Sequence, residues 1–229
     1  FHTVSCPKCG RTARRESDTM DTFVCSSWYH YRYTDPHNAG EFASKEKMAY
    51  WMPVDVYVGG AEHAVMHLLY ARFFCKVLNK LGFVTFDEPF VKLINQGLIL
   101  AEDGRKMSKS LGNVINPDEV VREFGADTLR MYEMFMGPFE DAKPWSTKGI
   151  KGIRRFLEKV WQLITNYELR ITNYEAGNSA KSVIKNKECD TLLQQTIKKV
   201  TEDIEAFKFN TAIAQLMIFS NKLRAYRST

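Results

Sequence analysis

The chain lacks any apolar run long enough to span a bilayer, and no signal peptide opens it. We therefore expect a soluble, cytoplasmic protein with no membrane partner. It has only five cysteines, and just two of them are closely spaced, a pattern typical of a reducing compartment and unlike a disulfide framework. Repeats and low-complexity segments are absent. The first residue is phenylalanine instead of methionine, which suggests a piece of a longer protein.

Acidic charge is scarce in the last third of the chain. Residues 148–229 contain 15 Lys and Arg against 8 Asp and Glu, a net charge of +7, whereas the rest carries 17 against 19. A basic C-terminal part is a modest argument for a nucleic-acid partner, although solvated helices are often lysine-rich as well.

The chain up to about residue 145 alternates strand-like and helix-like segments. A short strand over 54–58 ends in Gly59 and Gly60, a helix is expected over 62–81, and a second strand over 92–100. This order predicts an α/β fold with a parallel sheet, whose ligands gather beyond the carboxyl ends of its strands. The apolar face of the predicted helix consists of Val65, Leu68, Leu69, Phe73 and Val77.

The rest of the chain is predicted to be an all-α bundle. Three apolar stripes at helical spacing predict three helices, separated first by a polar stretch over 172–187 and then by a short link at 209–211. Asn210 is expected to cap the last helix, and the short link predicts that the last two helices are antiparallel neighbours. Asn116 and Pro117 predict an earlier helix start. The stripes are Ile150, Ile153, Leu157, Val160 and Ile164; Leu193, Ile197, Val200, Ile204 and Phe207; and Ile213, Leu216, Met217 and Leu223.

A glycine-led turn opens into the run Lys106-Met107-Ser108-Lys109-Ser110. Lysines are mobile cations with three donors, suited to charge that develops on a phosphate, and hydroxyls and backbone amides can hold the remaining oxygens. A solvated basic loop is the alternative for an arbitrary sequence. The run resembles the KMSKS signature of class I aminoacyl-tRNA synthetases, which activate an amino acid with ATP and transfer it to tRNA.

Four further runs are similar to leucyl-tRNA synthetases of bacterial and organellar type. They are Asp18–Tyr29, Gly59–Tyr70, the segment from Pro138-Phe139 to Trp145-Ser146, and Phe209–Ile213. Isoleucyl and valyl relatives differ at the first two. The resemblance implies an α/β part that is the second half of a Rossmann-like nucleotide-binding domain. It also implies leucine, ATP with Mg²⁺, and tRNA(Leu) as substrates.

The resemblance assigns the ATP site to residues that follow the two predicted strands. Glycines before a helix permit close approach of a ligand, and a carboxylate such as Glu62 can accept two ribose hydroxyls, although it is otherwise an ordinary acidic helix-start residue. Lys106 and Lys109 are the expected catalytic cations, which neutralise the departing pyrophosphate. The implied ATP-binding residues are Gly59, Gly60, Glu62, His63, Gln96, Met107, Ser108 and Lys109.

The same resemblance implies that Phe23, Ser26, Tyr29 and His67 line the pocket for the amino-acid side chain. The first three recur at every third position, and His67 is expected one helical turn after His63, on the same face. Without the resemblance, core packing would be the preferred interpretation of such an aromatic stripe. Cys25 stands where many relatives carry an acidic residue.

The implied organisation has three parts. Residues 1–17 form a zinc-knuckle-like connector, 18–145 the C-terminal half of the catalytic domain with stem-contact helices, and 146–229 part of a helical anticodon-binding domain. The His-x-Gly-His signature of the family is missing from this sequence, as is an editing domain. We therefore expect the N-terminal half of the synthetase as a partner, covalent or separate, and no activity from the chain alone. The alternatives are a tRNA-binding module without turnover and an isoleucyl or valyl fragment.

Cys6 and Cys9, with Gly10 after them, form half of a tetrahedral zinc site, to which His2 could add a third ligand. We predict that the purified protein binds one zinc ion if the remaining ligands are present. Elemental analysis with thiol titration tests this. Less than about a tenth of an equivalent of metal, with both thiols titratable, would indicate an orphaned half-site.

Overall fold

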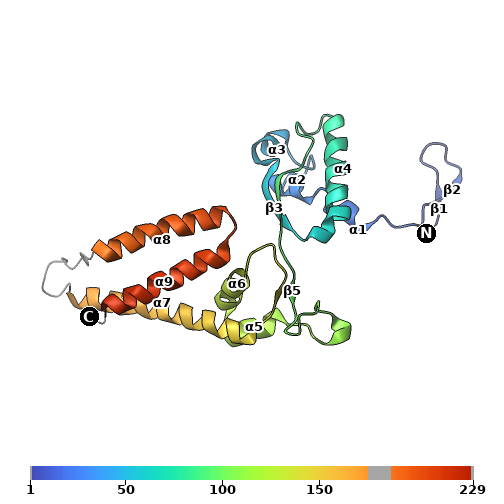
Figure 1. The fold of residues 1–229 in the computed structure, drawn as a ribbon. Helices are drawn as coiled ribbons and strands as arrows, with labels where there is room; N and C mark the ends of the chain where they lie inside the picture. Colours follow the sequence, from blue (N-terminus) through green and yellow to red (C-terminus); the bar gives the residue numbers. More distant parts are fainter. Residues whose placement is uncertain (1, 175–186, 228–229) are drawn as a thin grey trace. The chain divides into compact units, whose positions relative to one another are not determined.

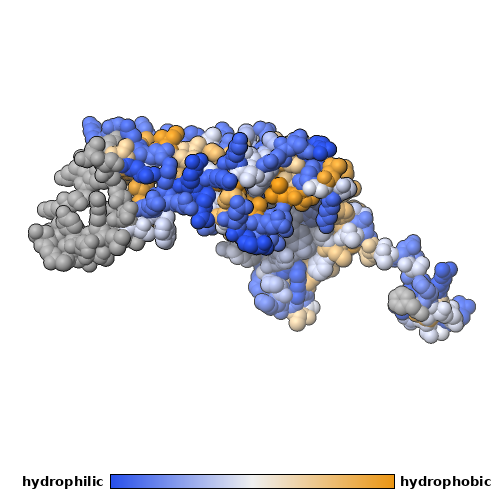
Figure 2. Space-filling model, turned by 90° about the horizontal axis from the view of Figure 1, so that it is seen from below, coloured by the Kyte–Doolittle hydropathy of each residue, from blue (hydrophilic) through white to orange (hydrophobic). Residues whose placement is uncertain are grey.

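The computed structural model describes residues 2–174 and 187–227 and divides into two compact units, residues 1–95 and 96–229 (Figure 1). The surface seen in Figure 2 is mostly hydrophilic and is interrupted by separate hydrophobic patches. Among the described residues, no helix is long and apolar enough to cross a membrane.

The first unit contains a small parallel sheet beside short helices. Strands β3 (Val54–Gly59) and β4 (Phe90–Asn95) pair in parallel, and Gly59 lies opposite Asn95 at their carboxyl ends. This confirms the predicted strand, crossover helix and parallel strand. The other elements are the hairpin β1 (Thr3–Ser5) and β2 (Thr12–Arg14), helices α1 (Thr22–Ser26), α2 (Tyr29–Thr34), α3 (Lys45–Trp51) and α4 (His67–Lys80), and the 3₁₀ helix η1 (Ala61–Val65).

Local sequence signals explain where the short helices of this unit begin. The Asp21 carboxylate accepts a hydrogen bond from the backbone N–H of Phe23, and the Ser44 hydroxyl accepts one from Lys47, so both cap a helix N-terminus. The core that these helices cover consists of Tyr31, Ala43, Met48, Met52 and Val84.

The continuous helix predicted over 62–81 was wrong in two respects. The helix is interrupted at Met66, whose φ of −118° and ψ of −109° are not helical. The residues before it form the separate 3₁₀ helix η1, and α4 begins after it. The buried face of α4 is formed by His67, Leu68, Ala71 and Cys75. Leu68 is buried as predicted, but the other four apolar residues of the predicted face, Val65, Leu69, Phe73 and Val77, are between 38% and 77% exposed, because the face of α4 that packs inside this unit is the one with His67, Ala71 and Cys75.

The second unit begins with a second, smaller parallel pair. Strands β5 (Ile99–Leu100) and β6 (Lys143–Pro144) pair in parallel, so the single strand predicted over 92–100 is two strands in different units. The reason lies at Gly97, where the backbone of Asp141 approaches so closely that a side chain would overlap it.

Helices make up most of this unit. They are the 3₁₀ turn η2 (Lys109–Leu111), α5 (Pro117–Phe124), α6 (Ala126–Phe135), α7 (Thr147–Tyr174), α8 (Lys187–Glu205) and α9 (Phe209–Arg227). Asn116 caps α5 and Pro117 is its first residue, as predicted. The core consists of Val120, Phe124, Leu129, Tyr132, Trp145, Ile150 and Ile153. Ile150 and Ile153, the first two residues of the first predicted apolar stripe, are therefore buried in this core.

The last two helices are antiparallel neighbours, as predicted. Glu188, Thr196 and Asp203 of α8 contact Lys222, Gln215 and Thr211 of α9 in reverse order. The predicted cap was wrong, because α9 already begins at Phe209 and Asn210 lies inside it. The turn is made instead by Phe207, which adopts a positive φ of 57°.

The second predicted stripe is also largely exposed. Leu193, Ile197 and Ile204 of α8 are between 37% and 50% exposed, and polar Thr196 and Asp203 take the buried positions because α9 supplies their hydrogen bonds. Of the polar stretch predicted over 172–187, residues 172–174 belong to α7 and 187 to α8, and the others lie outside the described residues.

We predict that Gly97→Ala lowers the free energy of unfolding of the chain by about 1–3 kcal/mol, the usual cost of forcing atoms into a packed site. Its added methyl would overlap the carbonyl of Asp141, so β5 or the 138–142 loop must shift. Urea denaturation measures the change. Gly152→Ala is the control, because nothing lies within 4 Å of its added carbon and alanine favours helix α7. Equal stability of the two variants would contradict the prediction.

Candidate active site

The glycine turn after β3 is shaped around a carboxylate. The side chain of Glu62 folds back over Gly60, and a side chain at that glycine would overlap the carboxylate. Glu62 itself is exposed at the first turn of η1. The absence of a side chain at Gly60 leaves room for this carboxylate, which remains open to a hydroxyl-bearing ligand beyond the end of the strand.

Aromatic and imidazole rings form a connected network behind this turn. Phe23 and His67 both lie 6.2 Å from the ring of His63, and Tyr29 lies 6.0 Å from His67. The break at Met66 allows this arrangement, since His63 and His67 come from different helices and not from successive turns of one helix, as the sequence had predicted. Three of the four predicted pocket residues thus share one network.

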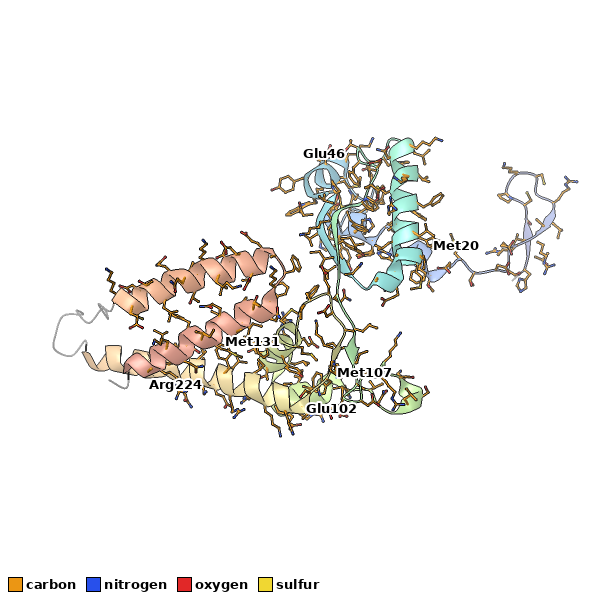
Figure 3. All side chains as sticks on the ribbon, in the orientation of Figure 1. Met20, Glu46, Glu102, Met107, Met131 and Arg224 are labelled. Carbon is orange, nitrogen blue, oxygen red and sulfur yellow. The ribbon has the colours of Figure 1, made fainter. Side chains whose placement is uncertain are left out.

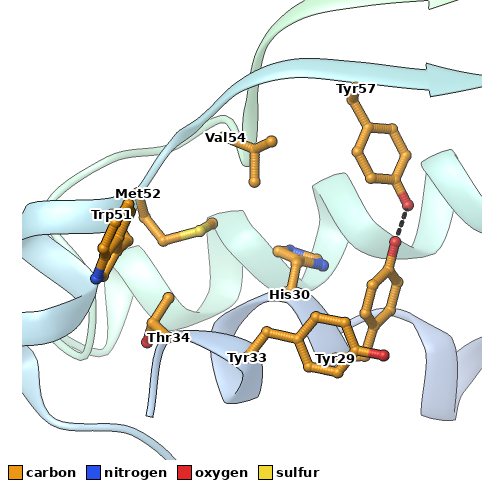
Figure 4. Close-up of a pocket in the computed structure, with 8 residues that line it drawn as sticks. All are labelled: Tyr29, His30, Tyr33, Thr34, Trp51, Met52, Val54 and Tyr57. Carbon is orange, nitrogen blue, oxygen red and sulfur yellow. Dashed lines mark hydrogen bonds between the residues drawn. The ribbon is translucent and has the colours of Figure 1, made fainter. Parts of the chain in front are cut away.

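Tyr57, in the middle of β3, links the network and was missed by sequence reasoning. Its hydroxyl shares a hydrogen bond of 2.6 Å with Nε2 of His67 and another with the hydroxyl of Tyr29 (Figure 4). The signal that could have identified it is its inward place on the strand that ends in Gly59-Gly60. Ser26, the fourth predicted residue, donates its hydroxyl to the carbonyl of Phe23 at 3.1 Å.

Burial favours the uncharged forms of three rings in and beside the network, His67, His30 and Tyr57. Burial lowers the pKa of His67, and the neighbouring His63 lowers it further. Burial also lowers the pKa of His30 to about 4, with a smaller contribution from His67. Burial, followed by the Tyr29 hydrogen bond, raises the pKa of Tyr57. Neutral rings of this kind suit an uncharged, apolar ligand group.

A cavity of about 460 Å³ adjoins the network (Figure 4). Among the predicted pocket residues, Tyr29 lines this cavity, and it does so together with Tyr57. Both ring nitrogens of the buried His30, which also lines it, lack a hydrogen-bond partner among the described residues. The other lining residues are Tyr33, Thr34, Trp51, Met52 and Val54.

The lysine loop belongs to the second unit and is internally braced. Met107 (Figure 3) packs against the apolar core. Lys106 and Lys109, on either side of it in the sequence, are exposed. Asn113 closes the loop, because its Oδ1 accepts the N–H of Ser108 at 2.8 Å and its Nδ2 donates to the carbonyl of Lys106 at 3.4 Å. The methionine therefore anchors the loop and leaves two cations facing solvent.

Two features complete the geometry of this loop. The hydroxyls of Ser108 and Ser110 share a hydrogen bond of 2.8 Å. Gly104 and Gly112, at the two ends, adopt positive φ of 76° and 63°, which glycine permits without strain. Gln96 is exposed directly after β4, between Glu62 and the loop in the sequence.

Cys6 and Cys9 lie in the turn of the β1–β2 hairpin. The N–H of Cys6 donates to the carbonyl of Arg11 and that of Gly10 donates to Cys6, both at 2.8 Å, and Gly10 has a φ of 71°. Hydrogen bonds from Arg11 hold the pKa of the Cys9 thiol below its ordinary value. Among residues 2–174 and 187–227, no group of three or more His, Cys, Asp or Glu side chains could hold a metal ion.

These two units carry the features of one known class of enzyme. The family model of class I tRNA synthetases (I, L, M and V) matches residues 6–144, and the chain belongs to this family. The model of the anticodon-binding domain of tRNA ligases matches residues 186–229. The predicted fold class, a Rossmann-like half followed by a helical part, is confirmed.

The structure is similar to the LeuRS of Agrobacterium radiobacter K84 (agnB2), solved in a ternary complex with tRNA and LeuAMS. The identity is 44%, the TM-score 0.86, and the match covers 98% of this chain and 29% of that one. The methionyl-tRNA synthetase of Mycobacterium tuberculosis, bound by methionyl-adenylate, has the same fold at 19% identity and a TM-score of 0.62, with 80% of this chain and 35% of that one covered. The chain thus spans much less than two thirds of either protein.

We predict that Tyr57→Phe raises the KM of the assembled enzyme for its amino acid about fivefold, because one hydrogen bond contributes about 1 kcal/mol. The variant keeps the ring and removes the hydroxyl shared by Tyr29 and His67. Steady-state ATP–pyrophosphate exchange gives the two KM values, and that for ATP should stay unchanged. Tyr50→Phe, at an exposed ring that does not line the cavity, is the control. Parallel losses for both substrates would indicate a packing role.

Proposed function

We propose that this chain is part of a leucine–tRNA ligase, which activates leucine with ATP and transfers it to tRNA(Leu). The observation that carries the proposal is the turn η1 between Gly60 and His67. It joins an exposed carboxylate that folds over Gly60, suited to a ribose, to a network of aromatic and imidazole rings, suited to an apolar side chain. The 44% identity to LeuRS supports leucine over isoleucine or valine.

Each substrate group has assigned residues in this proposal. Gly59, Gly60, Glu62 and His63 hold the adenosine, with Gln96 adding an amide contact. Phe23, Ser26, Tyr29 and His67 surround the leucine side chain, and Tyr57 holds the last two in place. Met107 and Ser108 position the lysine loop on the phosphates.

The proposed reaction is a nucleotidyl transfer. A carboxylate oxygen of leucine bonds to the α-phosphorus of ATP while the bond from that phosphorus to the pyrophosphate oxygen breaks. Lys106 and Lys109 meet the negative charge that builds on the leaving group. A lysine about 4 Å from a phosphate charge contributes roughly 4 kcal/mol at an effective dielectric constant near 20. Mg²⁺, which enters with ATP, supplies further neutralisation of the phosphates.

We propose that the N-terminal half of the synthetase covers the first unit. The exposed stripe on α4, together with Val56, Val58, Val91 and Leu93 on the two strands, leaves apolar surface on the helix and on the sheet. Both strands of a two-stranded sheet also have an open edge. A partner that continues the sheet would cover both, and it would add the phosphate-facing histidines that this sequence lacks.

The basic helical part is proposed to bind tRNA. An open cavity of about 560 Å³ beside α7 is lined by Phe124 and by Lys148, Lys151, Arg154 and Arg155. Clustered cations of this kind suit phosphate contacts. This surface also supports the second candidate, a tRNA-binding module without turnover.

Two finer proposals concern the metal and the compartment. Cys6 and Cys9 supply two of the four ligands that a structural zinc requires, so the other ligands would come from outside the described residues. The separate thiols favour a cytoplasmic location.

We predict that the chain alone does not activate leucine and that addition of the N-terminal half restores leucine-dependent ATP–pyrophosphate exchange. In the assembled enzyme, Lys109→Ala should lower the rate of leucyl-adenylate formation about a hundredfold, since loss of one such electrostatic contact costs about 3 kcal/mol, with little change in leucine binding. Single-turnover assays measure both. Lys80→Ala, at an exposed lysine that ends α4, is the control.

Two results would contradict parts of this proposal. Robust leucine-dependent exchange by the chain alone would contradict the need for the N-terminal half, although it would support leucine activation. Binding of tRNA with no exchange, even in the assembled protein, would favour the module without turnover.

A further inference from the structure

Helix α7 begins with a cap from a distant part of the chain. The backbone N–H of its first residue, Thr147, donates to Oε1 of Glu102 at 3.0 Å, and the hydroxyl of Thr147 donates to the same oxygen at 2.7 Å. Glu102 lies 45 residues earlier, between β5 and the lysine loop (Figure 3). One carboxylate therefore connects the start of the helical bundle to the stem of the loop, by which we mean the turn over residues 100–106 that leads into the lysines.

Backbone hydrogen bonds within the stem link Glu102 to the lysines of the loop. The N–H of Ala101 donates to the carbonyl of Arg105 at 2.9 Å, and Leu100 bridges to Lys106 in an antiparallel manner. Glu102 is thus at the tip of a tight turn whose far strand leads directly into Lys106. Movement of Glu102 would displace the stem on which Lys106 and Lys109 are carried.

The other side of the stem is fixed to the segment that precedes α7. Lys143 and Trp145 donate their N–H groups to the carbonyls of Leu98 and Leu100, both at 2.9 Å. These bonds end at Leu100, so they do not hold the turn itself. Among the described residues, Glu102 supplies the side-chain contact from this turn to α7.

The electrostatics favour this contact. The N-terminus of a helix carries a partial positive charge and unpaired N–H groups, which a carboxylate satisfies. The hydroxyl and amide of Thr147 lower the pKa of Glu102, so the contact is made by a charged carboxylate near neutral pH. It is an exposed contact, so its effect on overall stability is small.

We propose that Glu102 is a positioning residue of the lysine loop, which orders Lys106 and Lys109 by fastening their stem to α7. The alternative is a plain helix cap, which would order the first turn of α7 and leave the loop unaffected. The catalytic consequence rests on the proposed function, whereas the ordering of the loop does not.

Limited trypsin digestion of the chain separates the two roles. Trypsin cleaves after Lys106 and Lys109 in the loop and after Lys148 and Lys151 at the start of α7. Glu102→Ala should raise the initial rate of cleavage in the loop about fivefold, a factor in the range of one ordinary hydrogen bond, because both bonds that it removes are exposed. Faster cleavage at the helix start alone, with the loop unchanged, would overturn the proposal.

Matched variants sharpen the test. Glu102→Gln keeps an acceptor oxygen and should restore most of the protection. Thr147→Val removes the hydroxyl bond but keeps the backbone N–H bond, so it should loosen the loop less than Glu102→Ala does. The double variant should be no looser than Glu102→Ala alone, because that change already removes both bonds. Additive effects would indicate separate roles and contradict the proposal. Glu158→Ala, which removes an exposed ion pair with Arg154 within α7, is the charge-matched control.

In the assembled enzyme, Glu102→Ala should lower kcat of leucine activation and leave the KM for leucine unchanged, with rescue by Glu102→Gln. An inactive wild-type assembly would contradict the proposed function, but the digestion result would still decide the role of Glu102. An active wild-type enzyme with unaltered kcat in Glu102→Ala would overturn the catalytic part of the inference.

Discussion

The arrangement of the second unit depends on the parallel pairing of β5 with β6. Two backbone hydrogen bonds, from Lys143 to Leu98 and from Trp145 to Leu100, join segments more than forty residues apart. The pairing requires Gly97, because the neighbouring backbone occupies the space of a side chain there. It brings the stem of the lysine loop to the point where α7 begins. The loop, the core around Trp145 and the first bundle helix all follow from this approach.

The sequence predicted those parts of the fold that local periodicity and capping determine. Strand β3, the cap at Asn116 and the antiparallel last helices were confirmed. It did not predict the break at Met66 or the turn at Phe207, because neither has the glycine or proline that normally marks such backbone. The buried face of α4 was wrong for another reason. Periodicity identifies an apolar stripe but not which surface covers it.

The candidate site divides in a similar way. The residues in the Gly59–Tyr70 run and the lysine loop were assigned to the site because their pattern resembles a known family, and that assignment stays a prediction. Asn113 and Glu102 contact residues that the chain's path brings near, and no spacing rule points to them. The alternation of β3 places Tyr57 on the inward face but does not name its partners Tyr29 and His67. Polar side chains that hold other side chains are visible only once both partners have coordinates. Conversely, the hydroxyl of Ser26 donates a hydrogen bond to the backbone carbonyl of Phe23, a contact that was not predicted from its spacing.

The exposed stripe on α4 also affects how mutational data on this protein would be interpreted. The side chains of Val65 on η1 and of Leu69, Phe73 and Val77 on α4 are exposed, so polar replacements there would have little effect on the chain's own folding. A variant library selected only for soluble expression would record these four positions as freely variable, and would even enrich charged residues at them. Selection for growth on the complete enzyme would record them as restricted. The difference between the two substitution profiles would outline, residue by residue, the surface that the proposed N-terminal half would cover.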